Sequence, residues 1–596
     1  MVEKSNKSRI EERLKNVLIT MFHGDDYKNL ITLPTNRQMA DYVSNIAFSL
    51  AKTEKDSPIN LATKIADSFN EDTSFASASA VMPGFINFKL SNNSLLNVLN
   101  AISDKADKYG ENDQLKNQVW SIEHTSPNPN KAMHIGHLRN NLVGMSVGNI
   151  DEANGAKVIR DCIDNNRGIA ISKAMWGFLY FKRKDNKIID DVHYWVNHKD
   201  EWQSPYETNE KPDHFIGDCY QLASSALKDN KEKDQLVRQM TIDWENEDPD
   251  TRELWTYVLD LVHDGINQTL EKVDNKWDKV WHEHEHYKDG RDTILNNIET
   301  GVFKKAEDSN AILTNLKDRY GINDTIAIKS DGTSVYFTQD VALTKLKKDT
   351  FKADKMFWVI GPEQSLAMKQ VFATAELLGL GKLEDFIHLA YGLVAFQTKE
   401  GKKKKMSSRG GATLLIDDLI EDITNRLLKS DRNYSKEEAE KLAINAIKFA
   451  LLKPARNTDI TIDLDDAISI EGDSGIYILY TIARINTLLD KGKELGYTNN
   501  LSELKNISFN ENEKSLITLL DYYPEYVKNA LNNYMPNVLC EYLIELAHAF
   551  NALYAKERFV SEDKNETIKK LSIASAIKQT MTNASKLLGL TPVDRI

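Results

Sequence analysis

The stretch QVWSIEHTSPNPNKAMHIGHLRNNLVGMSVGNIDEANGAKVIRDCI, residues 118–163, indicates the fold of the chain. Its first residues, QVWSIEHTS, alternate as in a β-strand and then meet a loop rich in Pro and Asn. Apolar residues from Leu138 to Ile150 recur at roughly helical spacing, Asn154 and Gly155 can end that helix, and AKVIRDCI resumes as a strand. Strand, helix and strand form a βαβ unit, which builds a parallel sheet with ligands at the C-terminal ends of its strands.

Helical and strand patterns divide the rest of the chain. At 596 residues it exceeds one ordinary core, and we predict three or four units. Residues 1–105 combine helical stretches with the strand GFINFKLS, as in a small α+β domain. Residues 106–425 hold the parallel sheet, interrupted at 172–272 by a charged, Trp-rich helical insertion, and residues 426–596 form an all-helical domain. The pieces KWDKVWHEHEHY, TIAIK, SVYFTQDVAL and KMFWVIG are predicted to be strand-like.

The composition is that of an ordinary folded protein. Charged residues make up 28% and hydrophobic ones 41%, which argues against a disordered or fibrous chain. No apolar run is long enough to span a bilayer and no signal-peptide hydrophobic region is present, so we expect a cytoplasmic protein. The widely spaced Cys162, Cys219 and Cys540 are predicted to be buried thiols rather than disulfides or zinc ligands. A net charge of -13 argues against a surface that coats nucleic acid generally, but not against a local basic groove.

The loop that leads into the predicted helix carries a group of nitrogen-bearing side chains. His134 and His137 are three residues apart, so both can face the same side of the first turn. Free backbone N–H groups at a helix start favour anions, and Lys131 with the two imidazoles adds donors where phosphate oxygens would lie. Gly136 lets a base or ribose approach the backbone. The pattern favours a nucleoside triphosphate, with a capped helix or a zinc site that lacks a third ligand as alternatives.

A second basic segment lies far downstream. KKKKMSSRGG, residues 402–411, joins lysines, hydroxyls and two glycines in a loop able to wrap a polyphosphate, although a solvated charge run has the same composition. Together the two segments resemble the signature motifs of class I aminoacyl-tRNA synthetases, here His134-Ile135-Gly136-His137 and Lys405-Met406-Ser407-Ser408. Further stretches, including SPNPNKAMHIGHLRN, PGFINFKLS, SGIYILYTIARINTLL and YLIELAHAFNALYAKERF, narrow the resemblance to the arginyl-tRNA synthetases over nearly the whole chain.

The resemblance implies a Rossmann-like catalytic domain that binds ATP together with Mg²⁺. The residues that match the family's ATP site are His134, Gly136, His137, His388, Gly392, Lys405, Met406, Ser407 and Ser408. Ser408 stands where the class has a second lysine, and Lys131 matches the family lysine that takes over its role. The residues expected to be catalytic are therefore Lys131, His134, His137 and Lys405.

The resemblance also implies an arginine pocket. Glu123, Ser126 and Asn128 match residues that hold the α-amino and carboxylate groups of the amino acid, and Gln364 matches a further substrate contact.

The guanidinium end of that pocket is implied by three more residues. Tyr336 and Asp340 match the residues that face the guanidinium, which suits carboxylates and an aromatic face. Without the resemblance, a helix cap would be the preferred interpretation of Asp340. Glu283 lies near the position where the family has a glutamate as the second partner of the guanidinium, and it belongs to the run HEHEH, residues 282–286. Strand alternation would send its glutamates to one face and its three histidines to the other, which also suggests zinc, but we favour Glu283 in the pocket and predict no metal site.

The reaction implied by the resemblance is that of an arginine–tRNA ligase. The carboxylate of L-arginine attacks ATP to give arginyl-adenylate and pyrophosphate, and the terminal adenosine of tRNA(Arg) then takes the arginine and releases AMP. The helical domain resembles an anticodon-binding domain, in which Tyr480 and Arg484 are candidates for RNA or packing contacts, and the N-terminal domain resembles a module that touches the tRNA elbow. We expect a monomer. A class I ligase for another amino acid and a catalytically silent tRNA-binding relative are the alternatives.

Overall fold

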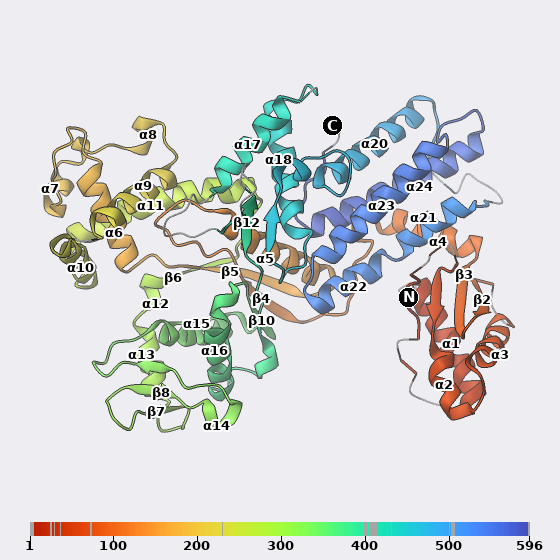
Figure 1. The fold of residues 1–596 in the computed structure, drawn as a ribbon, viewed down its shortest axis with the longest axis horizontal. Helices are drawn as coiled ribbons and strands as arrows, with labels where there is room; N and C mark the ends of the chain where they lie inside the picture. Colours follow the sequence, from red (N-terminus) through yellow and green to blue (C-terminus); the bar gives the residue numbers. More distant parts are fainter. Residues whose placement is uncertain are drawn as a thin grey trace.

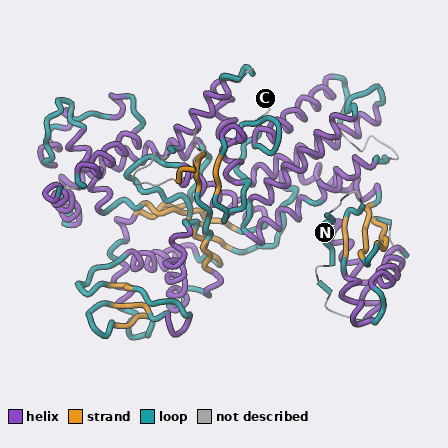
Figure 2. Tube along the Cα trace, in the orientation of Figure 1, coloured by secondary structure: helices purple, strands orange, loops and turns teal. Residues whose placement is uncertain are grey.

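A five-stranded parallel sheet lies at the centre of the molecule (Figure 1). The computed structural model of the protein describes residues 5–23, 27–28, 30–35, 37, 39–71, 74–228, 230–397, 403–405, 414–430, 432–499, 501 and 507–593. The strand order is β11-β10-β4-β5-β6, and each neighbouring pair is parallel. Figure 2 draws the strands in orange among the purple helices. The strands are β4 (Val119–Glu123), β5 (Lys157–Asp164), β6 (Lys279–His282), β10 (Lys355–Trp358) and β11 (Phe386–His388).

The predicted βαβ unit is confirmed. Helix α5 (Ile135–Ala153) runs from the end of β4 to the start of β5, and its apolar residues Leu138, Leu142 and Ile150 are buried. Asn154 caps the C-terminal end of α5, in agreement with the predicted stop. Because β4 and β5 are parallel, their carboxyl ends lie at the same edge of the sheet, and the loop after β4 and the start of α5 lie at that edge.

Helices fill the chain between β5 and β6. They are α6 (Ile169–Phe181), α7 (Val192–Asn197), α8 (Pro205–Thr208), α9 (Pro212–Ala226), α10 (Lys231–Glu245) and α11 (Pro249–Lys272), coloured gold to yellow-green in Figure 1. The helical pattern predicted for this stretch is confirmed. Their tryptophans are mostly structural, since Trp176, Trp195 and Trp244 are buried.

A second core lies between β6 and β10. The antiparallel strands β7 (Phe303–Lys305), β8 (Ile312–Thr314) and β9 (Ile326–Ile328) pack with α15 (Tyr336–Phe351) and α16 (Ser365–Leu377). The strand-like prediction for SVYFTQDVAL is wrong beyond Val335, because α15 begins at Tyr336. Aromatic and β-branched residues favour strands, but Phe337 and Val341 lie one helical turn apart and are both buried in this core.

The strand predicted through HEHEH is also wrong after its first histidine. Strand β6 ends at His282, which pairs with Asp164, the last residue of β5. Since β6 is an edge strand and β5 supplies no further backbone partners, the chain turns into the short helix α12 (Glu283–His286). The alternation of Glu and His therefore does not separate two faces.

The N-terminal and C-terminal parts of the chain pack against each other. The first is an α+β unit, with the antiparallel sheet β1-β3-β2 and helices on it. Its strands are β1 (Tyr42–Ser44), β2 (Ala76–Val81) and β3 (Phe85–Leu90), and its helices are α1 (Asn6–Phe22), α2 (Ile46–Glu54), α3 (Pro58–Asn70) and α4 (Asn92–Lys105). The hydroxyl of Tyr42 donates to the buried carboxylate of Asp521, 2.8 Å away, at their contact.

The C-terminal part is helical, as predicted. Its longer helices are α17 (Ile416–Leu428), α18 (Lys436–Leu452), α20 (Gly475–Glu494), α21 (Glu511–Asp521), α22 (Tyr523–Asn533), α23 (Asn537–Lys556) and α24 (Lys564–Leu587), drawn from turquoise to blue in Figure 1. One strand interrupts it, because β14 (Ile460–Ile462) pairs with β12 (Val394–Gln397) of the preceding part.

A buried guanidinium joins α5 to the loop before β14. Arg139 of α5 is fully buried and donates from Nη2 to the carbonyls of Ala455, Arg456 and Thr458, at 3.2, 3.0 and 2.9 Å. Gly392 packs against the same loop, since a Cβ there would lie 2.1 Å from the carbonyl oxygen of Thr458.

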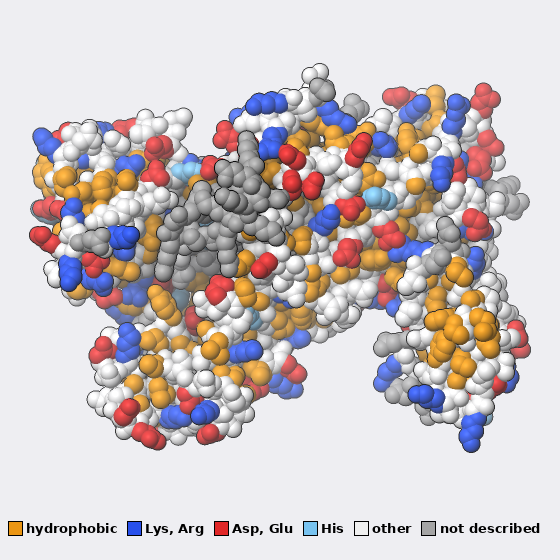
Figure 3. Space-filling view, viewed as in Figure 1, with side chains coloured by type: hydrophobic (Ala, Val, Ile, Leu, Met, Phe, Trp, Pro, Cys, Tyr) orange, Lys and Arg blue, Asp and Glu red, His pale blue; other side chains and the backbone are white. Residues whose placement is uncertain are grey.

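The remaining compositional predictions can be compared with the structure. All three cysteines are buried with free thiols, as predicted. Within the described ranges, no helix has both the length and the apolar character required to cross a bilayer. Acidic and basic side chains are interspersed over the face drawn in Figure 3.

Candidate active site

The start of α5 brings the two histidines of the first motif into contact. His134 is the residue before the helix, and its ring stacks on that of His137 with centroids 3.7 Å apart and planes 15° apart. Nδ1 of His137 accepts the backbone N–H of His134 at 3.2 Å. A side chain on Gly136 would place its Cβ 3.1 Å from ring atoms of His134, so glycine allows this packing. The prediction that both rings face the same side of the turn is confirmed.

Burial keeps these imidazoles neutral near pH 7. It lowers the pKa of His134 to about 4 and that of His137 well below its usual value, and the charge of Lys131 acts in the same direction. Among the described residues, Nδ1 of His134 has no hydrogen-bond partner. Burial also lowers the pKa of the half-buried Lys131, whose ammonium has no ion-pair partner in the described ranges. A neutral imidazole pair and an unpaired ammonium at a helix start form a site for an anion.

The segment after the second basic motif is bonded to this turn. The N–H of Ile135 donates to the carbonyl of Leu414 at 3.2 Å, and the N–H of Ile416 donates to the carbonyl of Met133 at 3.1 Å. His134 and Leu415 form an antiparallel bridge between these bonds. Residues 414–416, which follow the second motif in the sequence, therefore lie beside the turn of the first motif.

The other predicted ATP-site residues lie on nearby elements or beyond the described ranges. His388 ends β11, and its Nε2 donates to the carbonyl of Ile360 at 3.0 Å. Lys405 ends β13 (Lys403–Lys405), where its backbone pairs with Ala395 of β12. Met406, Ser407 and Ser408 lie outside the described residues.

Buried charges gather where β4, β5 and α15 meet. The carboxylate of Glu123, at the end of β4, accepts from Nζ of Lys347 at 2.6 Å, and the same ammonium contacts Asp161 of β5. Lys347 is 1% exposed. Burial alone would lower its pKa, but Asp161 and Glu123 raise it, so this lysine stays charged. Sequence reasoning missed Lys347, because it lies 224 residues from Glu123 and no local pattern links the two.

Asp340 lies beside this cluster with its charge uncompensated. It sits inside α15, whose preceding residue is Val335, so the helix-cap interpretation is wrong. Burial and the negative charge of Glu123 raise the pKa of its carboxyl to about 7, with Glu283 adding to the effect. Within the described ranges its carboxylate has no ion-pair partner, and a substrate cation would supply one.

The predicted partners of Asp340 are placed differently. Glu283 begins α12 and meets Nη1 of Arg167 at 3.4 Å, while Arg167 also pairs with Glu245 and lies over the ring of Tyr287. Burial raises the pKa of Glu283. Tyr336, the first residue of α15, is 86% exposed.

Two of the residues predicted to bind the α-amino and carboxylate groups of arginine instead hold the loop after β4 in place. Oγ of Ser126 accepts the N–H of Ile163 at 2.9 Å, and Oδ1 of Asn128 accepts from Nδ2 of Asn165 at 3.3 Å. Both bonds tie the loop after β4 to the end of β5. Gln364 is exposed at the end of the short helix η3 (Pro362–Gln364).

Sequence reasoning also missed Asn140, which fixes the loop after β4. Its Oδ1 accepts the N–H of Thr125 at 2.7 Å, and its Nδ2 donates to the carbonyl of Val359 at 2.6 Å. Thr125 has the left-handed φ of 57°, a conformation that such a bond helps to hold. An Asn inside an apolar helix face is a signal that sequence reading could have used.

The three histidines of HEHEH have separate surroundings. His282 bonds to Asp164 at 2.7 Å, His284 bonds to Asn166 at 2.8 Å, and His286 lies near Asp289. Their arrangement gives no support for a shared metal.

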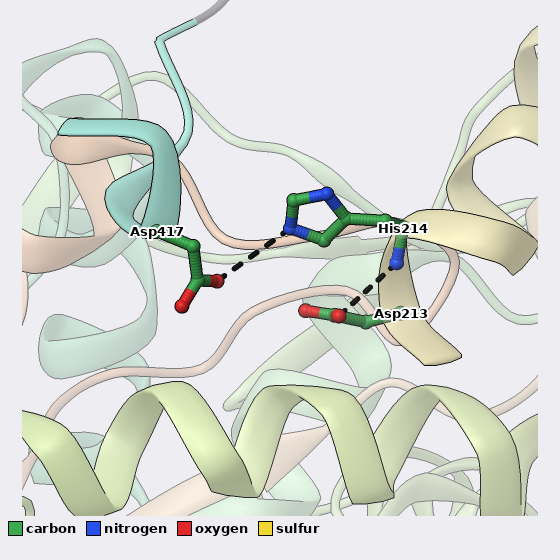
Figure 4. Close-up of side chains that lie close together, drawn as sticks. All are labelled: Asp213, His214 and Asp417. Carbon is green, nitrogen blue, oxygen red and sulfur yellow. Dashed lines mark hydrogen bonds and ion pairs between the residues drawn. The ribbon is translucent and has the colours of Figure 1, made fainter. Parts of the chain in front are cut away.

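One group elsewhere has the geometry of metal ligands. Asp213, His214 and Asp417 converge between α9 and the start of α17, as Figure 4 shows. Nζ of Lys211 lies 3.1 Å from Asp213 and 2.9 Å from Asp417. An ammonium therefore already compensates these carboxylates, and a divalent cation there would be repelled.

A cavity of about 930 Å³ opens in the helical C-terminal part between α20 and α23. Arg484 lies over the rings of Tyr480 and Tyr554, with centroids at 4.7 and 5.4 Å, and its Nη2 donates to the hydroxyl of Tyr480 at 3.2 Å. Lys491 and Arg558 also line the cavity. Aromatic faces beside cationic groups form a surface of the kind that stacks nucleotide bases.

Comparisons with known proteins agree with this geometry. Residues 97–169 and 195–464 match the family described as tRNA synthetases class I (R), catalytic domain. Residues 7–90 match the arginyl tRNA synthetase N terminal domain, and residues 478–596 match the DALR anticodon binding domain.

Full-length relatives and solved structures are similar too. The chain is 30% identical to the arginine–tRNA ligase of Borrelia turicatae over 99% of this chain and 98% of that one, and 28% identical to that of Bacteroides thetaiotaomicron over 94% and 95%. The arginyl-tRNA synthetase structure of Thermus thermophilus shares its fold with a TM-score of 0.76, at 22% identity over 99% of this chain and 100% of that one. That of Plasmodium falciparum gives 0.76 at 19% identity, covering 100% of both chains.

The parallel sheet with its histidine turn is thus the Rossmann-like catalytic domain of a class I tRNA synthetase. Within that class, the chain belongs to the arginyl-tRNA synthetases, the arginine–tRNA ligases. The resemblance read from the sequence and the predicted fold class are confirmed.

Proposed function

We propose that this site carries out both steps of the ligase reaction with ATP, L-arginine and tRNA(Arg). The observation that carries the proposal is the stacked, neutral His134 and His137 beside the unpaired ammonium of Lys131 at the start of α5. In-line attack of the arginine carboxylate on the α-phosphorus develops negative charge on the phosphate oxygens, which these donors would stabilise. The products are arginyl-adenylate and pyrophosphate.

The ATP site would extend from this turn along the neighbouring loops. Gly136 and His388 would contact the nucleoside, and Gly392 would shape the wall through its packing on Thr458. The family resemblance assigns the phosphate contacts on the other side to Lys405, Met406, Ser407 and Ser408. Mg²⁺ would arrive on the phosphates as part of the substrate, since the described residues at this turn offer imidazole and ammonium groups rather than the carboxylates that Mg²⁺ prefers.

The arginine pocket would use its carboxylates in two ways. Asp340 would bind the guanidinium directly, supported by its uncompensated charge, and Glu283 would be a second partner. Tyr336 would cover the guanidinium from the mouth of the pocket. Glu123, whose charge is shared with Lys347, would contact the α-amino group.

The remaining predicted contacts surround the α-amino and carboxylate groups. Ser126 and Asn128 would act through the loop that they fasten, and Gln364 would approach from its exposed turn.

Arginine would then pass to the terminal adenosine of tRNA(Arg), with release of AMP. Residues 426–596 would bind the anticodon region, with bases stacking near Tyr480 and Arg484, and residues 1–105 would touch the tRNA elbow. Residues 106–425, with the insertion at 172–272, would form the catalytic unit. We further propose that the protein is cytoplasmic, because tRNA charging takes place where translation does. We also propose that it is a monomer.

Arginine-dependent exchange of pyrophosphate into ATP tests this proposal, measured with and without tRNA(Arg) and beside a panel of other amino acids. Exchange that requires arginine is the expected result, and a requirement for tRNA would add the activation that the family resemblance implies. Exchange with another amino acid would overturn the pocket, and tRNA binding without any exchange would indicate a silent relative.

A further inference from the structure

The carboxylate of Asp417, at the start of α17, contacts side chains from the region of α9 and from α11 of the insertion. Oδ2 of Asp417 lies 2.9 Å from Nζ of Lys211 and accepts from Oγ1 of Thr269 at 2.9 Å. Nε2 of His214 lies 3.5 Å from the same oxygen, and Nζ of Lys272 lies 3.6 Å from Oδ1. Burial would raise the pKa of Asp417, but His214 and Lys211 lower it below its usual range, so the carboxylate stays charged.

The insertion side of this cluster is built to hold Lys211 in place. Asp213 is fully buried, and its Oδ2 accepts from Lys211 at 3.1 Å. Gly265 of α11 makes room for it, because a Cβ there would lie 2.4 Å from Oδ1 of Asp213. Lys211 also donates to Thr269 at 2.5 Å. Asp213 and His214 of α9 meet Asp417 of α17 as Figure 4 shows, and Thr269 brings α11 to the same carboxylate.

Asp417 follows directly after the segment that is bonded to the histidine turn. Among the residues that the structure describes, two backbone hydrogen bonds join Leu414 and Ile416 to residues 133–135, and both lie within three residues of Asp417. Helix α9, which carries the partners of Asp417, also packs beneath Lys131, since a Cβ on Gly217 would lie 3.4 Å from its Cα. Helix α9 therefore contacts both segments that the His134–Leu415 bridge joins, through Lys131 on one side and Asp417 on the other.

We propose that Asp417, through Lys211, His214 and Thr269, is a positioning residue for adenylate formation. It fastens residues 414–416 to the insertion and so holds the turn of His134 and His137 in register with Lys131. This role rests on the proposed functions of those three residues. Asp417 is not among the residues proposed to contact ATP or arginine, and the groups proposed to bind the arginine side chain lie on α12 and α15.

The test compares Asp417→Asn with Asp422→Asn, a matched change on the same helix at a carboxylate that pairs with the partly exposed Arg426. In arginine-dependent exchange, kcat should fall by about tenfold to a hundredfold in Asp417→Asn, because small displacements of aligned groups cost rates of that order. The KM for arginine should stay within about twofold. Asp422→Asn should match the unchanged protein.

Amide hydrogen exchange provides a readout that is independent of activity. The N–H groups of Ile135 and Ile416 should exchange faster in Asp417→Asn, while those of β4 keep their protection. Lys211→Met should speed the exchange of the same two N–H groups, because it removes the contact with Asp417. It should also destabilise the fold, because the buried Asp213 loses its ammonium partner. If Asp417→Asn does not fold, His214→Gln is measured in the same way.

Two results would overturn the proposal. One is an Asp417→Asn variant with unchanged kcat and unchanged protection of Ile135 and Ile416. The other is a fall in kcat with a parallel rise in the KM for arginine and no local change in exchange. If the unchanged protein shows no arginine-dependent exchange, the proposed function fails, and the amide measurement still decides whether Asp417 fastens the bridge.

Discussion

Nζ of Lys347 lies 2.6 Å from a carboxylate oxygen of Glu123, at the buried floor of the proposed arginine pocket. The same ammonium contacts Asp161, so one lysine compensates two acids and leaves Asp340 without a cation of its own. A pocket for a positively charged amino acid needs residual negative charge, and this division of partners provides it.

Lys347→Met should destabilise the fold by about 3 to 5 kcal/mol, because it leaves Glu123 and Asp161 buried without a counter-charge. The shift of the first urea unfolding transition measures this loss. Lys345→Met is the control, since Lys345 on the same helix is half exposed and pairs with Asp349, an arrangement worth at most about 1 kcal/mol. Equal shifts in the two variants would contradict the assignment.

Asp340→Asn should lower kcat/KM for arginine by an amount equivalent to about 2 to 5 kcal/mol, because it removes the charged partner of the guanidinium. Steady-state aminoacylation at varied arginine concentration measures it. Asp349→Asn, on the exposed side of the same helix, should have no effect. An Asp340→Asn enzyme with ordinary arginine kinetics would show that the guanidinium binds elsewhere.

Arginine affinity should weaken as the pH falls through neutrality. Burial and Glu123 raise the pKa of Asp340 to about 7, so the free protein holds a proton there that the guanidinium must displace. Below that pKa the KM for arginine should increase with each pH unit lost, by up to about tenfold per unit. Asp340→Asn should make the KM nearly independent of pH in this range. The free energy of unfolding depends on pH in the opposite direction. Since the ordinary pKa is 3.8, the free protein should lose stability as pH rises from there towards the folded value.

Lys131→Ala should slow adenylate formation about a hundredfold to a thousandfold, the usual effect of losing one preorganised donor to a developing negative charge. Pyrophosphate exchange with arginine and tRNA present measures this rate. Lys157→Ala, at the exposed opposite end of β5, removes the same charge far from the turn and should leave the rate unchanged. A normal rate in Lys131→Ala would exclude it from the phosphate site.

Tyr480→Ala should weaken tRNA binding by about 1 to 3 kcal/mol, the range for loss of one stacking platform. Filter binding of tRNA(Arg) measures the change. Tyr206→Ala removes an exposed tyrosine of the insertion and is the control. If both variants bind tRNA as the unchanged protein does, Tyr480 serves packing with Arg484 and Arg432 rather than tRNA binding.

Local patterns predicted the elements that depend on neighbouring residues, and missed the contacts between distant ones. The βαβ unit of residues 118–163 was readable because strand alternation and helical spacing are both local signals. The strand predicted for the start of α15 is wrong, because the packing of its β-branched and aromatic residues in the second core outweighs their intrinsic preference for strands. The stacking of His134 on His137 follows from their spacing, whereas the bond from Lys347 to Glu123 depends on how two separate elements meet.

The guanidinium of Arg139 has a consequence for protein engineering. Its three carbonyl partners and the close approach of Gly392 fix the backbone that leads from α18 into β14 and the helices from α20 onward. A chimera that exchanges those helices for the corresponding ones of a relative should therefore be joined after this loop, or carry Arg139 and Gly392 with it. A junction placed within residues 455–458 would leave a buried cation facing a backbone that no longer fits it.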